Sequence, residues 1–160
     1  RTSGETPLQM MRLVMALAVD TNILVHALNT RSDRHGQARD FLTSIADRKD
    51  VVISEHVLVE LYLLVRNPAV FSKPYTADAA VSACKRFRSN PNWRVVECRG
   101  VMDQVWRHAG ATEFARRRII DLRLGLTLRS AGVTEFATCN TRHFEGLGFD
   151  RVFDPFARTG

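Results

Sequence analysis

Short apolar runs alternate with helical patterns along most of the chain, and this alternation limits the folds that the chain can adopt. Apolar runs typical of strands occupy residues 13–20, 51–53, 93–97, 133–139 and 151–154. Apolar spacing and capping signals predict helices over residues 22–28, 34–48, 54–66, 76–88, 102–109 and 115–130, the last ending at Gly132. Strands that alternate with helices predict a parallel sheet with helices on both faces.

The 160 residues are enough for one hydrophobic core and too few for two ordinary domains. Residues 1–12 have no periodicity and predict a disordered lead-in or an expression remnant, followed by a single domain over residues 13–157. The apolar run from Leu13 to Val19 is at the lower limit for a signal peptide, and cleavage there would destroy the first core strand. No run approaches a membrane span, so we expect no membrane partner.

Composition narrows the class of protein further. A hydrophobic content of 45% with 25% charged residues is typical of a globular protein. The three cysteines show neither a zinc-ligand spacing nor a disulfide framework, which favours the cytoplasm. The net charge of +6, mostly from arginine, agrees with a nucleic-acid partner, but a GC-rich genome would also enrich arginine.

Polar residues stand at the carboxyl ends of two predicted strands, where parallel sheets form their ligand crevice. Asp20 ends the first strand, and Asn140 follows the strand over residues 133–139. Asp20 could instead simply cap the next helix, and Asn140 could be a turn residue.

Two further acids lie in predicted helices. Glu60 is the only charged residue in VLVELYLLV (57–65). Its carboxylate could be partly buried, and would then need a cation, or it could lie on an exposed face of the helix. Asp121 could pair with Arg117 or Arg118, or it could serve a site. Gly125 costs about 1 kcal/mol relative to alanine inside a helix, which predicts the close approach of another element or a ligand.

These acids and the Asn140 amide could meet at one edge of the sheet. Carboxylates gathered together repel one another unless a cation sits among them. Oxygen ligands without histidine or cysteine select Mg²⁺ or Mn²⁺, and such ions promote phosphodiester hydrolysis.

Three segments in order resemble VapC-type PIN domains and together span nearly the whole chain after residue 13. They are AVDTNILV (18–25), SEHVLVELYLLVRNP (54–68) and RRRIIDLRLGLTLRSAGVTEFATCNTRHFEGLGFDRVFDP (116–155). The resemblance implies a three-layer α/β/α sandwich with a mainly parallel sheet of four to five strands. It also implies a Mg²⁺-dependent endoribonuclease, the toxin of a toxin–antitoxin pair. We therefore expect an RNA substrate (transfer RNA, ribosomal RNA or mRNA), a cognate antitoxin and a homodimer.

The same resemblance assigns roles to individual residues. Asp20 and Asp121 match the most direct metal ligands, and Glu60 matches an acid that orients or activates the attacking water. Asn140 matches a position that is Asp or Asn in relatives. The residues expected beside the metal or the substrate are Thr21, Asn22, Thr138, His143 and Arg117.

One position departs from the family. His143 stands before Phe144 where relatives often have aspartate, so it could bind metal, contact phosphate at the mouth of the crevice or contact nothing. Arg116–Arg118 could line an RNA groove, contact the antitoxin or form a solvated helix face. We expect Trp93 and Trp106 to pack in the core, or one of them to lie in a dimer interface.

Two other functions compete with a ribonuclease. A haloacid-dehalogenase-type phosphatase requires an acid two residues after Asp20, where this chain has Asn22. A PIN scaffold with weak or no catalysis that binds RNA or protein agrees with Asn140 and His143, but it would have no reason to keep the three acids.

Overall fold

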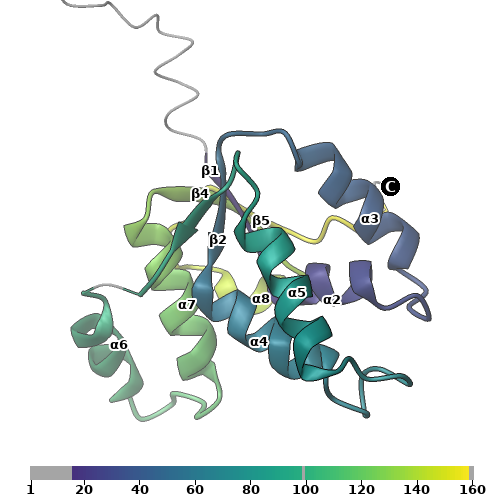
Figure 1. The fold of residues 1–160 in the computed structure, drawn as a ribbon. Helices are drawn as coiled ribbons and strands as arrows, with labels where there is room; N and C mark the ends of the chain where they lie inside the picture. The colour runs from purple at the N-terminus through teal and green to yellow at the C-terminus, as the bar shows by residue number, and fades with distance from the viewer. Residues whose placement is uncertain (1–15, 99, 159–160) are drawn as a thin grey trace, which may run out of the picture.

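The computed structural model describes residues 16–98 and 100–158. The predicted lead-in over residues 1–12 lies outside the described residues. The elements, in chain order, are β1 (Ala16–Val19), α2 (Thr21–Leu28), α3 (His35–Ile45), β2 (Val51–Ser54), α4 (Glu55–Val65), α5 (Ala77–Arg88), β3 (Arg94–Val96), α6 (Met102–Ala109), α7 (Arg118–Ser130), β4 (Val133–Ala137), α8 (Thr141–Phe144) and β5 (Arg151–Phe153). Figure 1 shows their arrangement.

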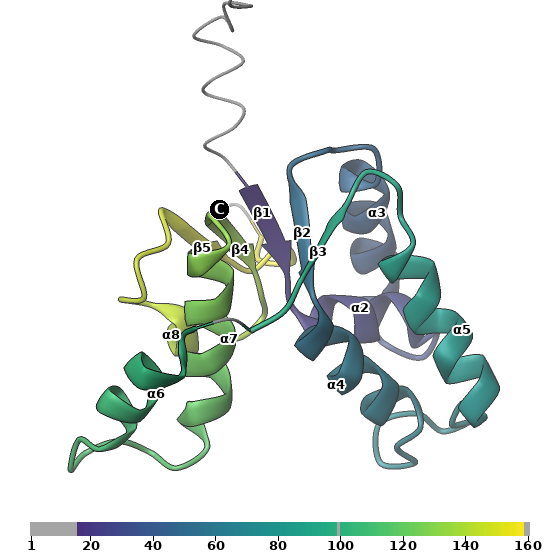
Figure 2. The same cartoon turned by 60° about the vertical axis from the view of Figure 1, so that its left-hand side comes forward.

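Five strands form one sheet in the order β3-β2-β1-β4-β5, and every neighbouring pair is parallel. The chain moves from β1 outward to β3, then returns to the other side of β1 for β4. Because crossovers between parallel strands are right-handed, this reversal puts α2–α5 on one face and α6–α8 on the other (Figure 2). The predicted α/β/α sandwich is confirmed, and the sheet is wholly parallel.

The central strands are apolar because helices cover both faces of the sheet. All four residues of β2 are buried, as are the last three of β1. The expected cap Ser54 is confirmed, since it accepts a hydrogen bond from the His56 N–H at the start of α4. Of the two candidates for the cap of α5, Thr76 and Asp78, it is Thr76 that accepts from the Ala79 N–H. Gly132 follows α7 with φ +83°, a conformation that suits glycine.

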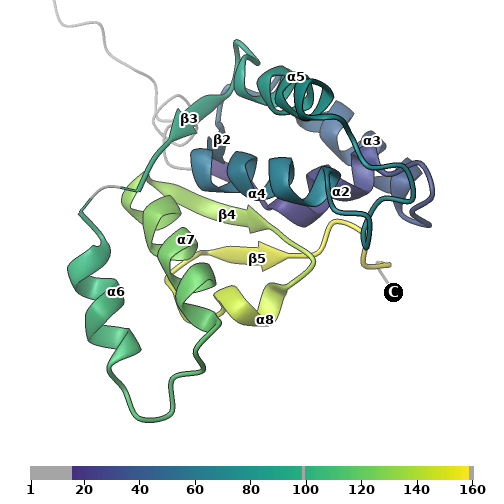
Figure 3. The same cartoon turned by 60° about the horizontal axis from the view of Figure 1, so that its bottom comes forward.

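Helix α7 connects the sheet to the smaller elements α6 and α8 (Figure 3). Its Leu124 and Leu128 belong to the main core, while Leu122 and Leu126 pack with α6 in a second apolar cluster. A Cβ on Gly125 would lie 2.5 Å from Leu147 Cδ1. The predicted close approach at this glycine is therefore confirmed, and the loop after α8 makes it.

Three details of the predicted elements were wrong. Helix α7 begins at Arg118 rather than residue 115, because cations in the first turn oppose the helix dipole and no side chain caps this end. The short helix α8 was not predicted, since its four residues are too few to show a period. Trp93 is buried as expected, but the expected core position of Trp106 is wrong, since it is 60% exposed and α6 buries only the narrow face around Val105. The alternative place for Trp106, a dimer interface, stays a prediction.

Candidate functional site

Asp20 lies where the winding of the sheet reverses. It follows β1, and its backbone N–H donates to the Ala137 carbonyl at the end of the neighbouring strand β4 (3.0 Å). In open parallel sheets, ligands bind outside the strand ends at this switch point. The carboxylate also accepts a hydrogen bond from the Thr21 N–H (2.8 Å), so Asp20 caps α2 from this switch point of the sheet.

The Asp20 carboxylate is buried and lies among other negative charges. Only 6% of the residue is exposed, and burial raises its pKa from 3.8 to about 6. Hydrogen bonds from Thr138 and Thr21 oppose this rise, while the Glu60 and Asp121 carboxylates add to it. The three acids of distant segments therefore lie within electrostatic reach of one another, as expected.

Glu60 approaches from α4 and is fixed by two neighbours. The Thr21 hydroxyl donates to Glu60 Oε2 (2.8 Å), and His56 Nε2 lies 3.6 Å from Glu60 Oε1. His56 and, less strongly, Thr21 lower the pKa of Glu60 against the effect of burial, so the acid stays ionised near neutral pH. The buried Nε2 of His56 has no hydrogen-bond partner among the described residues and faces this acid.

Asp121 lies in the first turn of α7 and pairs with α8. His143 Nδ1 is 2.8 Å from Asp121 Oδ2, and because a carboxylate only accepts, Nδ1 carries the proton. The alternative partners Arg117 and Arg118 form no ion pair with Asp121, and both are exposed. His143 thus places an imidazole directly on Asp121, one of the predicted site acids.

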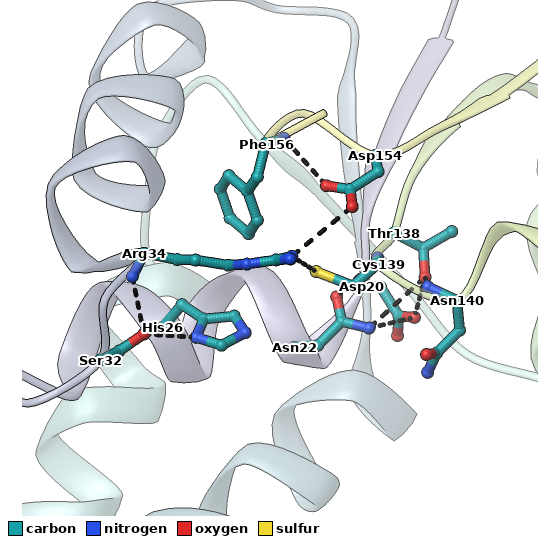
Figure 4. A network of polar contacts seen from close by, with 10 residues as sticks. All are labelled: Asp20, Asn22, His26, Ser32, Arg34, Thr138, Cys139, Asn140, Asp154 and Phe156. Carbon is teal, nitrogen blue, oxygen red and sulfur yellow. Dashed lines mark hydrogen bonds and ion pairs between the residues drawn. The ribbon is translucent and has the colours of Figure 1, made fainter. Parts of the chain in front are cut away.

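Thr138, Asn22 and Asn140 complete the strand-end network (Figure 4). The Thr138 hydroxyl donates to Asp20 Oδ2 (2.7 Å) and accepts from the Asn140 N–H (3.0 Å). Asn22 Nδ2 lies 3.4 Å from Asp20 Oδ2, and Asn22 Oδ1 accepts from the Cys139 N–H (3.2 Å). Asn140 therefore lies at the site, but it reaches the network through its backbone and its residue is exposed.

Arg34 was not expected near the site. Its side chain runs from the loop before α3 toward the strand ends (Figure 4), where Nη1 lies 3.6 Å from Asp154 Oδ2 and 3.9 Å from Cys139 Sγ. The Phe156 ring packs on the guanidinium, with 5.6 Å between the ring centroid and Cζ. Nothing in the sequence distinguishes this loop arginine from the many others, so only the fold could reveal its position.

Comparisons with known proteins show the family of this chain. The PIN-domain signature matches residues 17–149, and the chain is 46% identical over 144 residues to Ribonuclease VapC24 of Mycobacterium tuberculosis, covering 90% of this chain and 99% of that protein. This chain is a VapC-type member of the PIN-domain family.

Solved structures share the PIN fold at lower identity. M. tuberculosis VapC20, described as a toxin that cleaves the sarcin–ricin loop, has a TM-score of 0.60 at 21% identity, covering 84% of this chain and 96% of its own. FitAcB from Neisseria gonorrhoeae has a TM-score of 0.60 at 20% identity, covering 89% and 99%. DNA-bound VapBC from Salmonella typhimurium has a TM-score of 0.57 at 17% identity, covering 88% and 98%.

The donor set of this PIN domain suits a hard divalent cation. Asp20, Glu60 and Asp121 offer oxygen ligands, and burial and the two other carboxylates raise the pKa of Asp20, a penalty that a bound cation would offset. Within residues 16–98 and 100–158, no group of three or more acidic, histidine or cysteine side chains is placed so that it could hold a metal ion by itself. Mg²⁺ commonly binds through one or two carboxylates and several waters, so a complete protein cage is not required.

Each helix in the described part of the chain is too short or too polar to cross a membrane.

Proposed function

We propose that this VapC-type endoribonuclease hydrolyses RNA with Mg²⁺, or Mn²⁺ in its place, held by Asp20, Asp121 and Glu60. The buried Asp20 at the switch point of the sheet carries this proposal. Its ionisation is opposed by burial and by two nearby carboxylates, and a divalent cation would reverse that penalty. The 46% identity to a named ribonuclease across the domain supports the reaction class.

The surrounding side chains hold these acids in fixed orientations. The Thr21 N–H and the Thr138 hydroxyl fix both oxygens of Asp20, and Asn22 links this acid to the end of β4. His143 holds Asp121 from α8. The bound ion would neutralise phosphate charge and lower the pKa of water.

Glu60 accepts the proton of the attacking water in this mechanism. The Thr21 hydroxyl holds one carboxylate oxygen, and the contact with His56 keeps the acid ionised. Asn140 and Arg117 are exposed beside the site elements, where they can contact the RNA backbone.

Partners and location follow from the same assignment. We propose a transfer RNA, ribosomal RNA or mRNA substrate, a cognate antitoxin, a homodimer and a cytoplasmic location for a single domain over residues 13–157. VapBC and FitAB complexes among the structural relatives support the antitoxin. The free thiols of Cys84, Cys98 and Cys139 agree with a reducing compartment.

Metal-dependent cleavage tests the proposed function. The purified chain should cut a mixture of transfer and ribosomal RNA only with added Mg²⁺ or Mn²⁺, while Asp121→Asn should lose at least about a hundredfold in rate, as for loss of a group that stabilises a transition state. Asp40→Asn, an equivalent change at an exposed acid on α3, is the matched control and should cut normally. Equal cleavage by Asp121→Asn and the wild type would contradict the proposal, whereas a wild type with neither cleavage nor metal-dependent stabilisation would favour an inactive PIN scaffold.

A further inference from the structure

We propose that Arg34 binds a phosphate of the RNA substrate next to the metal-binding acids. This inference rests on the proposed ribonuclease function. It gives a role in substrate binding to a side chain from the loop before α3, and no sequence pattern connects this loop with the site.

The position of Arg34 is linked to Asp20 through short contacts. Arg34 Nη1 lies 3.9 Å from Cys139 Sγ, and the Cys139 N–H donates to Asn22, which in turn contacts Asp20. Burial raises the pKa of Cys139 to about 11, with the Asp154 carboxylate and, more weakly, that of Asp20 adding to the rise and Arg34 opposing it. Arg34 and Asp20 therefore lie on either side of one residue at the end of β4.

The guanidinium is held in place, yet most of its donors are free. Phe156 covers one face of the group. The backbone N–H of Arg34 also donates to the Ser32 hydroxyl oxygen (3.1 Å), which fixes the backbone from which the side chain extends. Nη1 makes both polar contacts of the guanidinium, one with Asp154 and one with Cys139. The contact with Asp154, at 3.6 Å, is longer than a hydrogen bond. Within the described part of the chain, Nη2 and Nε contact no polar atom, and 42% of the side chain is exposed.

This arrangement suits a phosphate better than a purely structural role. The site acids repel the RNA backbone, so a fixed cation beside them is needed to seat the phosphate that neighbours the cleaved bond. A guanidinium held by packing loses little entropy when it binds two phosphate oxygens at once. The competing role is purely structural: Arg34 would act as a clamp that holds residues 154–156 in place, and only its ion pair with Asp154 would be needed for that.

RNA binding by paired variants separates the two roles. In an Asp121→Asn background, which binds without cutting, Arg34→Gln should weaken binding of fluorescein-labelled transfer RNA about tenfold and reduce the slope of log K against log salt by about one. Asp154→Asn should leave binding unchanged or tighter, because it frees the guanidinium while asparagine can still accept from the Phe156 N–H. Arg39→Gln, the same charge change at an exposed site on α3, is the control and should leave the slope closer to that of the parent.

Equal losses of RNA affinity in Arg34→Gln and Asp154→Asn would overturn the inference and favour the purely structural clamp. Unchanged affinity and slope in Arg34→Gln would also overturn it, with thermal unfolding used to confirm that each variant is folded. If the wild type cuts RNA normally while either result is found, the inference alone fails. Absence of metal-dependent cleavage by the wild type would instead remove the proposed function, and this inference with it.

Discussion

Replacing Asp20 with asparagine should stabilise the metal-free protein at neutral pH, although Asp20 is the central residue of the proposed site. The pKa of Asp20 rises from 3.8 to about 6 in the folded chain, so the native state binds its proton more tightly than the unfolded state does. Such a group favours folding only while it is protonated. As the pH rises from about 4 to 6, the folded state therefore loses stability.

The magnitude follows from the difference between the two pKa values. A difference of about two pKa units corresponds to a loss of roughly 3 kcal/mol in the free energy of unfolding, and this loss is complete above pH 6. Asparagine is neutral throughout but cannot accept the hydrogen bonds from both Thr21 and Thr138 with its single carbonyl, which costs about 1 kcal/mol. We expect Asp20→Asn to be about 1–2 kcal/mol more stable above pH 6 and about 1 kcal/mol less stable below pH 4.

Urea unfolding in the presence of EDTA, repeated across this pH range, measures both signs of the effect. Adding Mn²⁺ should then stabilise the wild type and leave Asp20→Asn nearly unchanged, because only the carboxylate gains from the cation. The Asp40→Asn control should follow the wild type at every pH. A less stable Asp20→Asn at neutral pH without metal would refute the proposed electrostatic penalty.

Two further predictions test contacts between α7 and the segment that follows β4. His143→Ala should weaken Mn²⁺ binding several-fold, measured by calorimetric titration, because Asp121 loses the donor that positions it. His143→Asn should keep most of the Mn²⁺ affinity, because its amide offers a donor near the position of Nδ1. Equal Mn²⁺ affinities in the two variants would argue against a positioning role. Gly125→Val should destabilise the domain by about 1–3 kcal/mol in urea unfolding, because even a Cβ there would lie 2.5 Å from Leu147 Cδ1 and 3.4 Å from Phe144 Cδ1. An unchanged unfolding midpoint in Gly125→Val would show that this approach is looser than the structure indicates.

The sequence was most informative where the determining forces are local. Continuous apolar runs predicted the buried strands, because a strand covered on both faces can expose few polar groups. Ser54 and Thr76 predicted helix starts, because a capping side chain reaches backbone N–H groups only two or three residues away. The position of Asp20 at a strand end then followed from the parallel sheet.

Where the local signal was weak, prediction failed. Helix α8 spans four residues and carries no period, so the resemblance placed His143 near the site but no local pattern indicated its contact with Asp121. The arginines before α7 resembled part of a helix, but the helix begins only at Arg118. Trp106 is a large apolar side chain, yet it lies on a face of α6 that no described element covers.

By itself, then, the sequence determined the alternating architecture and the candidate acids, one at a strand end and two in helices, since both depend on periodicity and on residue type. The tertiary structure decided which side chains orient those acids. The contacts of Asp121 with His143 and of Glu60 with His56 and Thr21, and the approach of Arg34 to Cys139, depend on how α4, α7, α8 and one loop pack around the sheet. Contacts of this kind leave no local pattern, because each is between residues brought together by burial of the shared core rather than by their spacing in the chain.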